Sequence, residues 1–272
     1  MNYTMTEMFG IEGRVVAITG GCGGIGYGLA EGLAKLGAKI ALIDMNQEKL
    51  EASAQKLAEK TGAEVRGYSA NITDEASVDT AFEKIYNDFG SVYGLINCAG
   101  ISHVSPLSTM PMDRWEAVMD VNVRGTVICC KAAGRYMAKN HEGRIINISS
   151  LAATHGKPGY TAYTPSKAAV NGFTFTLAAE WGRLGINVNS VSPVMVVTDI
   201  NRGQVEADPD YLPRICSTIP QGRICSPELL CGTMVFLLSE ASSYVTGQNI
   251  GCDGGCQNGD ISVIKPPTEM GA

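Results

Sequence analysis

Apolar runs rich in β-branched residues alternate with longer segments of helical period, and this alternation constrains the fold more than any other feature of the sequence. Such an alternation is typical of βαβ units, whose strands are parallel. We expect strands at residues 14–20, 39–45, 64–70, 94–100, 144–150, 186–193 and 248–254. We expect helices at residues 24–37, 46–60, 74–89, 113–139, 163–183 and 226–239. The pattern predicts an α/β fold in which helices flank a doubly wound, seven-stranded parallel sheet.

The chain length and its apolar content favour one large domain. A chain of 272 residues with 45% hydrophobic residues can bury a substantial core. No proline- or serine-rich linker, charge block or internal repeat marks a boundary, so we expect a single domain over residues 1–272. Residues 199–226 interrupt the alternation and hold three prolines, which is typical of a functional loop or lid. Residues 260–272 are expected to fray or to pack on another subunit.

The charge balance excludes two classes of partner. With a net charge of −6 and a pI near 5.2, the protein has no electrostatic reason to bind nucleic acid or anionic membranes. Residues 1–14 show no basic region followed by an apolar run, and no segment reaches the length of a membrane span, so we expect a cytoplasmic location. The nine cysteines form no CxxC pair and lie far from the three histidines, so we expect reduced thiols and no metal site.

A glycine-rich loop joins the first expected strand to the first long helix. Gly20, Gly24 and Gly26 let the backbone approach a pyrophosphate, and the helix N-terminus offers free N–H groups. Asp44 closes the second strand, where a carboxylate accepts hydrogen bonds from both hydroxyls of an adenosine ribose and repels a 2′-phosphate. The loop could also be a tight turn only, and Asp44 could start a turn or cap the next helix. We expect a dinucleotide site that prefers NAD(H) over NADP(H).

Tyr163 and Lys167 form a second constellation. On a helix, residues four apart share one face, so the phenol and the ammonium can approach a common target. An ordinary surface pair is the alternative interpretation.

With these residues the chain resembles the classical short-chain dehydrogenase/reductase family over nearly its whole length. The motifs that carry the resemblance are TGGCGGIG at 19–26, NCAG at 97–100, Asn122 in VNVRG, NISS at 147–150, YTPSK at 163–167, SPVMVVT at 192–198 and VTGQNIGCDGG at 245–255. Their number and order make the resemblance specific. It implies a single-domain Rossmann fold and an enzyme that interconverts a secondary alcohol and a ketone.

The resemblance also implies roles for four catalytic residues. Tyr163 would be the general acid/base, with its pKa lowered by Lys167 and by an oxidised nicotinamide. Lys167 would also hydrogen-bond the nicotinamide ribose, and Ser150 would hold the substrate oxygen. Asn122 would position a water that relays protons to Lys167. Ser149 is an alternative to Ser150, and Asn122 could instead satisfy a buried helix kink.

The resemblance further implies a set of cofactor contacts. These are Gly20, Cys22, Gly24, Ile25, Gly26, Asp44, Asn71, Ile72, Asn97, Gly100, Tyr163, Lys167, Val196 and Thr198. Thr198 could bond the nicotinamide carboxamide or be a plain loop threonine. His103 and His155 could face the substrate, although we expect them to be solvated or structural.

Three residues depart from the family pattern. Cys98 replaces an asparagine, Asn71 replaces an aspartate near the adenine, and Val194 replaces a glycine after Pro193. Asn71 can still offer its amide to adenine. A branched side chain at position 194 predicts a narrower nicotinamide pocket or a shifted backbone.

The expected lid resembles that of sugar-, sugar-acid- and polyol-specific relatives, and its polar side chains could meet hydroxyls or a carboxylate. Those side chains are Asn201, Arg202, Gln204 and Arg214. Alternatives are a 3-ketoacyl or hydroxysteroid reductase and, from another class, a non-catalytic NAD-binding regulator. Family analogy also implies a homotetramer or homodimer.

Overall fold

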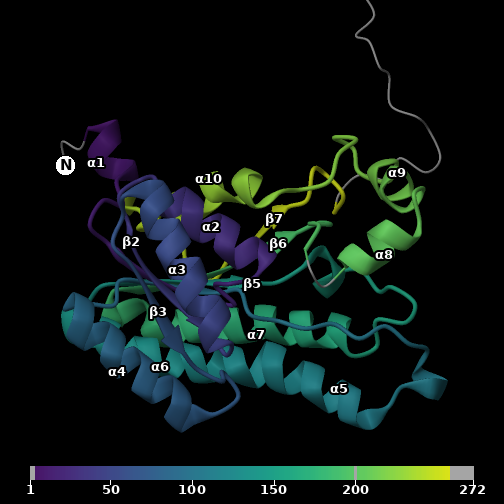
Figure 1. The fold of residues 1–272 in the computed structure, drawn as a ribbon, viewed down its shortest axis with the longest axis horizontal. Coiled ribbons are helices and arrows are strands. Elements are labelled where there is room, and N and C mark those ends of the chain that lie inside the picture. Colours follow the sequence, from purple (N-terminus) through teal and green to yellow (C-terminus); the bar gives the residue numbers. More distant parts are fainter. Residues whose placement is uncertain (1–3, 199–200, 258–272) are drawn as a thin grey trace, which may run out of the picture.

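One parallel sheet organises the molecule. The computed structural model describes residues 4–198 and 201–257, so the expected tail at 260–272 and the first two residues of the expected lid lie outside the described residues. Seven strands pair in the order β3-β2-β1-β4-β5-β6-β7 (Figure 1). They are β1 (Val15–Thr19), β2 (Lys39–Asp44), β3 (Val65–Ser69), β4 (Gly94–Asn97), β5 (Gly143–Ile148), β6 (Ile186–Pro193) and β7 (Asn249–Cys252). The strand order reverses between β1 and β4, which opens a crevice at their carboxyl ends.

Helices cover both faces of the sheet and complete the doubly wound fold (Figure 1). One face carries α2 (Gly24–Ala34), α3 (Gln47–Thr61) and α10 (Pro227–Leu238). The other face carries α4 (Glu75–Phe89), α6 (Gly125–Asn140) and α7 (Tyr163–Trp181). Short 3-10 turns lie at Leu107–Thr109, Leu151–Ala153, Gly182–Leu184 and Glu240–Ser242.

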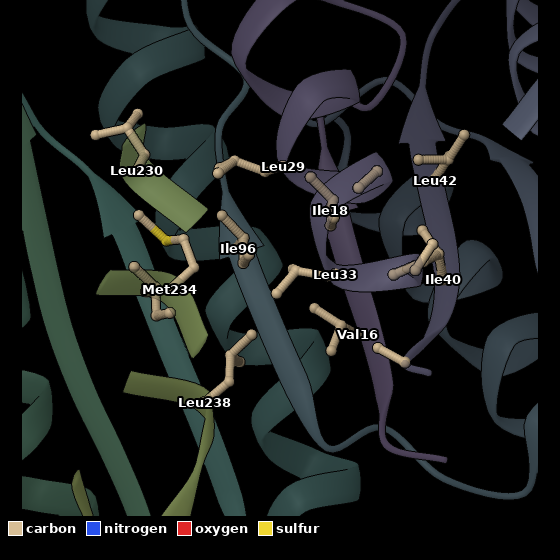
Figure 2. Packing of buried hydrophobic residues seen from close by; sticks show 14 of the residues in the cluster. Val16, Ile18, Leu29, Leu33, Ile40, Leu42, Ile96, Leu230, Met234 and Leu238 are labelled. Atoms are coloured by element: carbon tan, nitrogen blue, oxygen red, sulfur yellow. The ribbon is translucent and has the colours of Figure 1, made fainter. Parts of the chain in front are cut away.

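Strand β1 shows why the sheet is buried on both sides. Val16 and Ile18 belong to the apolar cluster under α2 and α10, whereas Val15 and Ala17 belong to the cluster on the opposite face. Successive side chains of a strand point to opposite faces of the sheet. Because helices cover both faces here, the strand needs apolar residues at every position. Figure 2 shows the first cluster, in which Leu29 and Leu33 of α2 meet side chains of β1, β2, β4 and α10. Burying each leucine contributes roughly 1.5–3 kcal/mol.

The helix expected at 113–139 is present but is not α-helical throughout. The chain instead forms α5 (Met112–Met119), a π-helical turn at Asp120–Arg124 and α6. The backbone N–H of Gly125 donates to the carbonyl of Asp120, five residues earlier, which widens the helix at this point. The widened turn carries Asn122, whose bonds to other segments are described below.

Three short helices escaped the sequence prediction. Inside the expected lid, α8 (Arg202–Ala207) and α9 (Tyr211–Cys216) replace an irregular loop. Near the N-terminus, α1 (Met5–Phe9) is capped by Thr4 and Glu7, whose side chains and backbone N–H groups bond reciprocally. Each helix has only one or two turns, too short for a hydrophobic period to show in sequence. In the described part of the chain, no helix is long and apolar enough to cross a membrane.

Candidate active site

A cleft of about 690 Å³ lies at the carboxyl ends of the strands. Its walls come from the segments that follow β1, β2, β4, β5 and β6, which are far apart in sequence. This is the place where open parallel sheets bind their ligands, because the connections diverge there at the switch in strand order.

The glycine-rich loop forms one end of the cleft. Gly20 has φ +63, and a Cβ there would lie 2.9 Å from the Cα of Ala99. A Cβ on Gly26 would collide with the carbonyl oxygen of Gly20, so both positions require glycine. Gly20, Gly24, Ile25 and Gly26 all line the cleft. The loop and the N-terminus of α2 thus form a cradle that fits a dinucleotide pyrophosphate.

Asp44 lies at the end of β2 and lines the same end of the cleft. Its carboxylate accepts backbone hydrogen bonds from Cys22 (3.3 Å), Met45 (2.9 Å) and Asn46 (3.4 Å). Asn46, not Asp44, caps α3 through its bond from the N–H of Lys49. Lys49, in the first turn of α3, also lines the cleft.

Three of the four expected catalytic residues line the cleft. Ser150 follows β5, Tyr163 begins α7, and Lys167 lies one turn later on the same helix. The hydroxyl of Ser150 accepts from the N–H of Ala152 at 3.1 Å and acts on the pKa of Tyr163, as described below. Ser149 instead donates to the carbonyl of Lys167 at 3.2 Å. Of the two serines, Ser150 is therefore the one placed beside the phenol.

Burial dominates the electrostatics of this group. It raises the pKa of Tyr163, and the neighbouring hydroxyl of Ser150 partly opposes that rise. Burial lowers the pKa of Lys167 to about 8. Its Nζ donates to the carbonyl of Ile148 at 2.8 Å and lies 5.8 Å from the centre of the Tyr163 ring. The pKa of Tyr163 is thus raised, whereas a lowered pKa was expected beside an oxidised nicotinamide. In the protein without a cofactor, desolvation is the largest influence on this pKa.

Asn122 lies behind the cleft and is only 1% exposed. Its Oδ1 accepts from the N–H of Ile101 at 2.9 Å, and its Nδ2 donates to the carbonyl of Ile101 and to the hydroxyl of Ser166, both at 3.0 Å. The side chain thus ties the π-helical turn to the segment after β4 and to α7. The water-positioning role implied for Asn122 stays a prediction.

The segment after β6 lines the cleft next to the N-terminus of α2. Val196 and Thr198 line the cleft, and Thr198 packs so close to Gly24 that a Cβ on the glycine would lie 2.9 Å from the threonine methyl. Asn201 holds this segment, since its Oδ1 accepts from the N–H of Thr198 at 2.9 Å and its Nδ2 donates to the carbonyl of Val196 at 2.8 Å.

Two expected cofactor contacts lie elsewhere. The side chain of Asn97 donates to Asn147 Oδ1 at 2.8 Å inside the protein, and the side chain of Cys22 packs in the core beside α2. Neither residue lines the cleft, because both side chains point into the protein interior. Asn71, Ile72 and Gly100 do line it.

Two of the departures from the family pattern also line the cleft. Burial raises the pKa of the Cys98 thiol to about 12, with Lys167 opposing the rise, so the thiol is neutral. Val194 donates its N–H to the carbonyl of Cys252 at 3.4 Å and packs against the core. Val194 does not adopt a positive φ, so a branched residue fits there without backbone strain.

Sequence reasoning missed most of the other end of the cleft. Lining side chains that it did not select as site residues include Leu151, His155, Lys157, Tyr160, Met195, Tyr211, Ile215, Thr218 and Cys256. His155 lines the cleft and His103 does not. The available signal was position, because residues 151–162 connect Ser150 to Tyr163 and must run beside them.

Comparisons with known proteins agree with this geometry. A family profile described as enoyl-(acyl carrier protein) reductase matches residues 20–257. The chain is 35% identical over 247 residues to D-threitol dehydrogenase of Mycolicibacterium smegmatis, covering 91% of this chain and 94% of the relative. It is 36% identical over 245 residues to the 3-oxoacyl-[acyl-carrier-protein] reductase FabG of Aquifex aeolicus, covering 90% and 98%.

Among solved structures, a gluconate 5-dehydrogenase from Burkholderia cenocepacia in complex with NADP and tartrate superposes with a TM-score of 0.90. It is 34% identical, and the match covers 94% of this chain and 100% of that one. The chain therefore belongs to the classical short-chain dehydrogenases/reductases and is an NAD(P)-dependent oxidoreductase that acts on alcohol and ketone groups.

Proposed function

We propose that this protein is a dehydrogenase that interconverts a secondary alcohol of a polyol or sugar acid with the corresponding ketone. The observation that carries the proposal is that Ser150, Tyr163 and Lys167 all line a single cleft, with Lys167 one helical turn after Tyr163. Relatives named for threitol and gluconate support the substrate class.

Each catalytic residue has a role that follows from its position. Tyr163 accepts the proton of the substrate hydroxyl during oxidation and returns it during reduction. The hydroxyl of Ser150 donates a hydrogen bond to the substrate oxygen and stabilises the charge that develops there. The ammonium of Lys167 favours the phenolate of Tyr163.

The cofactor would lie between the glycine-rich loop and the segment at Val196–Thr198. A nicotinamide held there supplies the hydride acceptor or donor. Asp44 supports a preference for NAD(H), because its charge would oppose a 2′-phosphate at close range. Lys49 shares that end of the cleft and would reduce the discrimination without reversing it.

The assembly is the remaining part of the proposal. We propose a single domain that associates into a homodimer or homotetramer through α7. Between Pro165 and Ala179, the exposed surface of helix α7 carries no charged side chain and includes Phe175, which is 48% exposed. The nine free cysteines support a cytoplasmic location.

Replacing Tyr163 by phenylalanine tests the function. We expect kcat to fall at least about a hundredfold, while the affinity for NADH changes little because only the proton carrier is removed. Tyr160→Phe is the matched control, since that phenol lines the same cleft and its ring is 5.9 Å from that of Tyr163. Turnover is measured by NADH absorbance with a panel of substrates that contains alditols, aldonates, acetoacetyl-CoA and a hydroxysteroid.

Equal activity of Tyr163→Phe and the wild type would refute the assignment of Tyr163. If the protein turns over only acetoacetyl-CoA or only the steroid, the proposed substrate class is wrong and that compound indicates the correct one. Binding of NADH without turnover of any substrate would favour a non-catalytic regulator.

A further inference from the structure

Among the described residues, the lining of the cleft holds more basic than acidic side chains, although the chain as a whole is acidic. The chain has a net charge of −6, yet Asp44 is the one acidic residue among the described residues that line the cleft. The same lining contains Lys49, Lys157 and Lys167, together with His155. Because a cleft with low-dielectric walls focuses the field of the charges around it, this hollow attracts anions.

Part of this positive charge is explained by the proposed mechanism. Lys167 belongs to the catalytic group, and Lys49 lies near Asp44 at the opposite end from the loop that joins β5 to α7. Lys157 and His155 belong to that loop, between Ser150 and Tyr163, and the mechanism gives neither of them a role. The ammonium of Lys157 and the ring nitrogens of His155 are therefore available to a different ligand group.

Lys157 contacts the ring of Tyr160, which in turn contacts the ring of the catalytic Tyr163. Its Nζ lies 4.9 Å from the centre of the Tyr160 ring, and the Tyr160 ring meets the Tyr163 ring edge-on at 5.9 Å. The sum of these two distances is therefore an upper limit for the distance between the ammonium of Lys157 and the centre of the Tyr163 ring. In the described part of the chain, no carboxylate pairs with Lys157.

The hydrogen bonds around His155 assign its tautomer. The hydroxyl of Thr154 donates to the carbonyl of Leu151 at 3.1 Å, which uses its single proton. Its oxygen lies 3.0 Å from His155 Nδ1, so Nδ1 carries the hydrogen and donates. In the neutral imidazole, Nε2 is then a hydrogen-bond acceptor, suited to a substrate hydroxyl.

We propose that the substrate is a polyhydroxy carboxylate, an aldonate-type sugar acid, whose carboxylate pairs with Lys157 and whose neighbouring hydroxyl donates to His155 Nε2. This inference rests on the proposed oxidation of a polyol or sugar acid and adds which end of the substrate is recognised. The reacting carbon lies at Tyr163, and the carboxylate lies several carbons away along the chain of the sugar.

The experiment compares substrates that differ only in the charge at one end. Each aldonate is paired with the alditol of the same configuration: gluconate with glucitol, xylonate with xylitol, and threonate with threitol. We expect the wild type to have the higher kcat/KM for the aldonate of a pair. Lys157→Gln should lower the aldonate-to-alditol ratio of kcat/KM about fivefold, mainly through the KM of the aldonate. Lys157→Arg should restore the ratio.

The matched control is Lys139→Gln. Lys139 is also an exposed lysine, and its Nζ lies 5.1 Å from the centre of the Tyr136 ring, but it does not line the cleft. This variant should keep the wild-type ratio. Added salt should lower kcat/KM for the aldonate more than for the alditol, since it screens the ammonium–carboxylate attraction.

The outcomes separate this inference from the function on which it rests. If the wild type oxidises alditols or aldonates and Lys157→Gln leaves the ratio unchanged, recognition by Lys157 is refuted and the dehydrogenase remains. If the wild type oxidises neither class with NAD⁺ or NADP⁺, the proposed function fails first.

Discussion

Lys167→Met should make the protein more stable at neutral pH while it abolishes turnover. Lys167 is 5% exposed, and burial lowers its pKa from 10.5 to about 8. Each unit corresponds to about 1.4 kcal/mol, so keeping this lysine charged costs the folded protein about 3 kcal/mol below pH 8. Methionine loses the bond to the carbonyl of Ile148, worth about 1 kcal/mol. A net stabilisation of about 2 kcal/mol remains.

The effect has a defined pH dependence. Between the folded pKa of about 8 and the unfolded pKa of 10.5, the folded protein binds fewer protons than the unfolded chain. The free energy of unfolding of the wild type should therefore rise with pH in this window by about 1.4 kcal/mol per unit, relative to Lys167→Met. Below pH 8 both states are protonated and the difference between the two proteins should be flat. The advantage of the variant thus disappears as the pH approaches 10.

Urea unfolding from pH 7 to 10 measures this difference. Protein concentration is held constant because association would contribute to apparent stability. The control is Lys131→Met, which removes a lysine whose side chain is 58% exposed and should show no such pH-dependent gain. A Lys167→Met protein that is less stable than the wild type at pH 7, or a difference that does not change with pH, would refute the reasoning.

Three further predictions concern the cofactor and the assembly. Asp44→Asn removes the charge and keeps the shape, so the ratio of kcat/KM for NAD⁺ over NADP⁺ should fall about tenfold; an unchanged ratio would contradict the role of that carboxylate. Asn201→Ala loses both bonds to the segment after β6 and should raise the KM for NAD⁺ about fivefold or more in steady-state kinetics. Asn201→Asp keeps the bond from Thr198, so its KM should lie between those of the wild type and Asn201→Ala. Phe175→Glu should lower the molar mass measured by light scattering, and an unchanged mass would exclude α7 from the interface.

The secondary structure was predictable wherever the hydrophobic period was long. All seven strands end within three residues of their expected ends. For the five central strands the reason is burial on both faces, which makes each of them a largely buried run. The π-helical turn was not predictable in this way. A buried helix kink at Asn122 was one of two interpretations of that residue, but the hydrophobic period did not decide between them, because the bonds of Asn122 go to Ile101 and Ser166. Those partners are 21 and 44 residues away along the chain.

Sequence alone determined the order of strands and helices, the glycine-rich loop, and the spacing of Tyr163 and Lys167, because each depends on residues that are near one another in the chain. Only the tertiary structure decided that Asn97 and Cys22 lie outside the cleft and that His155, not His103, lies in it. It also decided that burial raises the pKa of Tyr163 and lowers that of Lys167. Burial and side-chain direction depend on segments that meet only in the folded protein, and no local pattern records them.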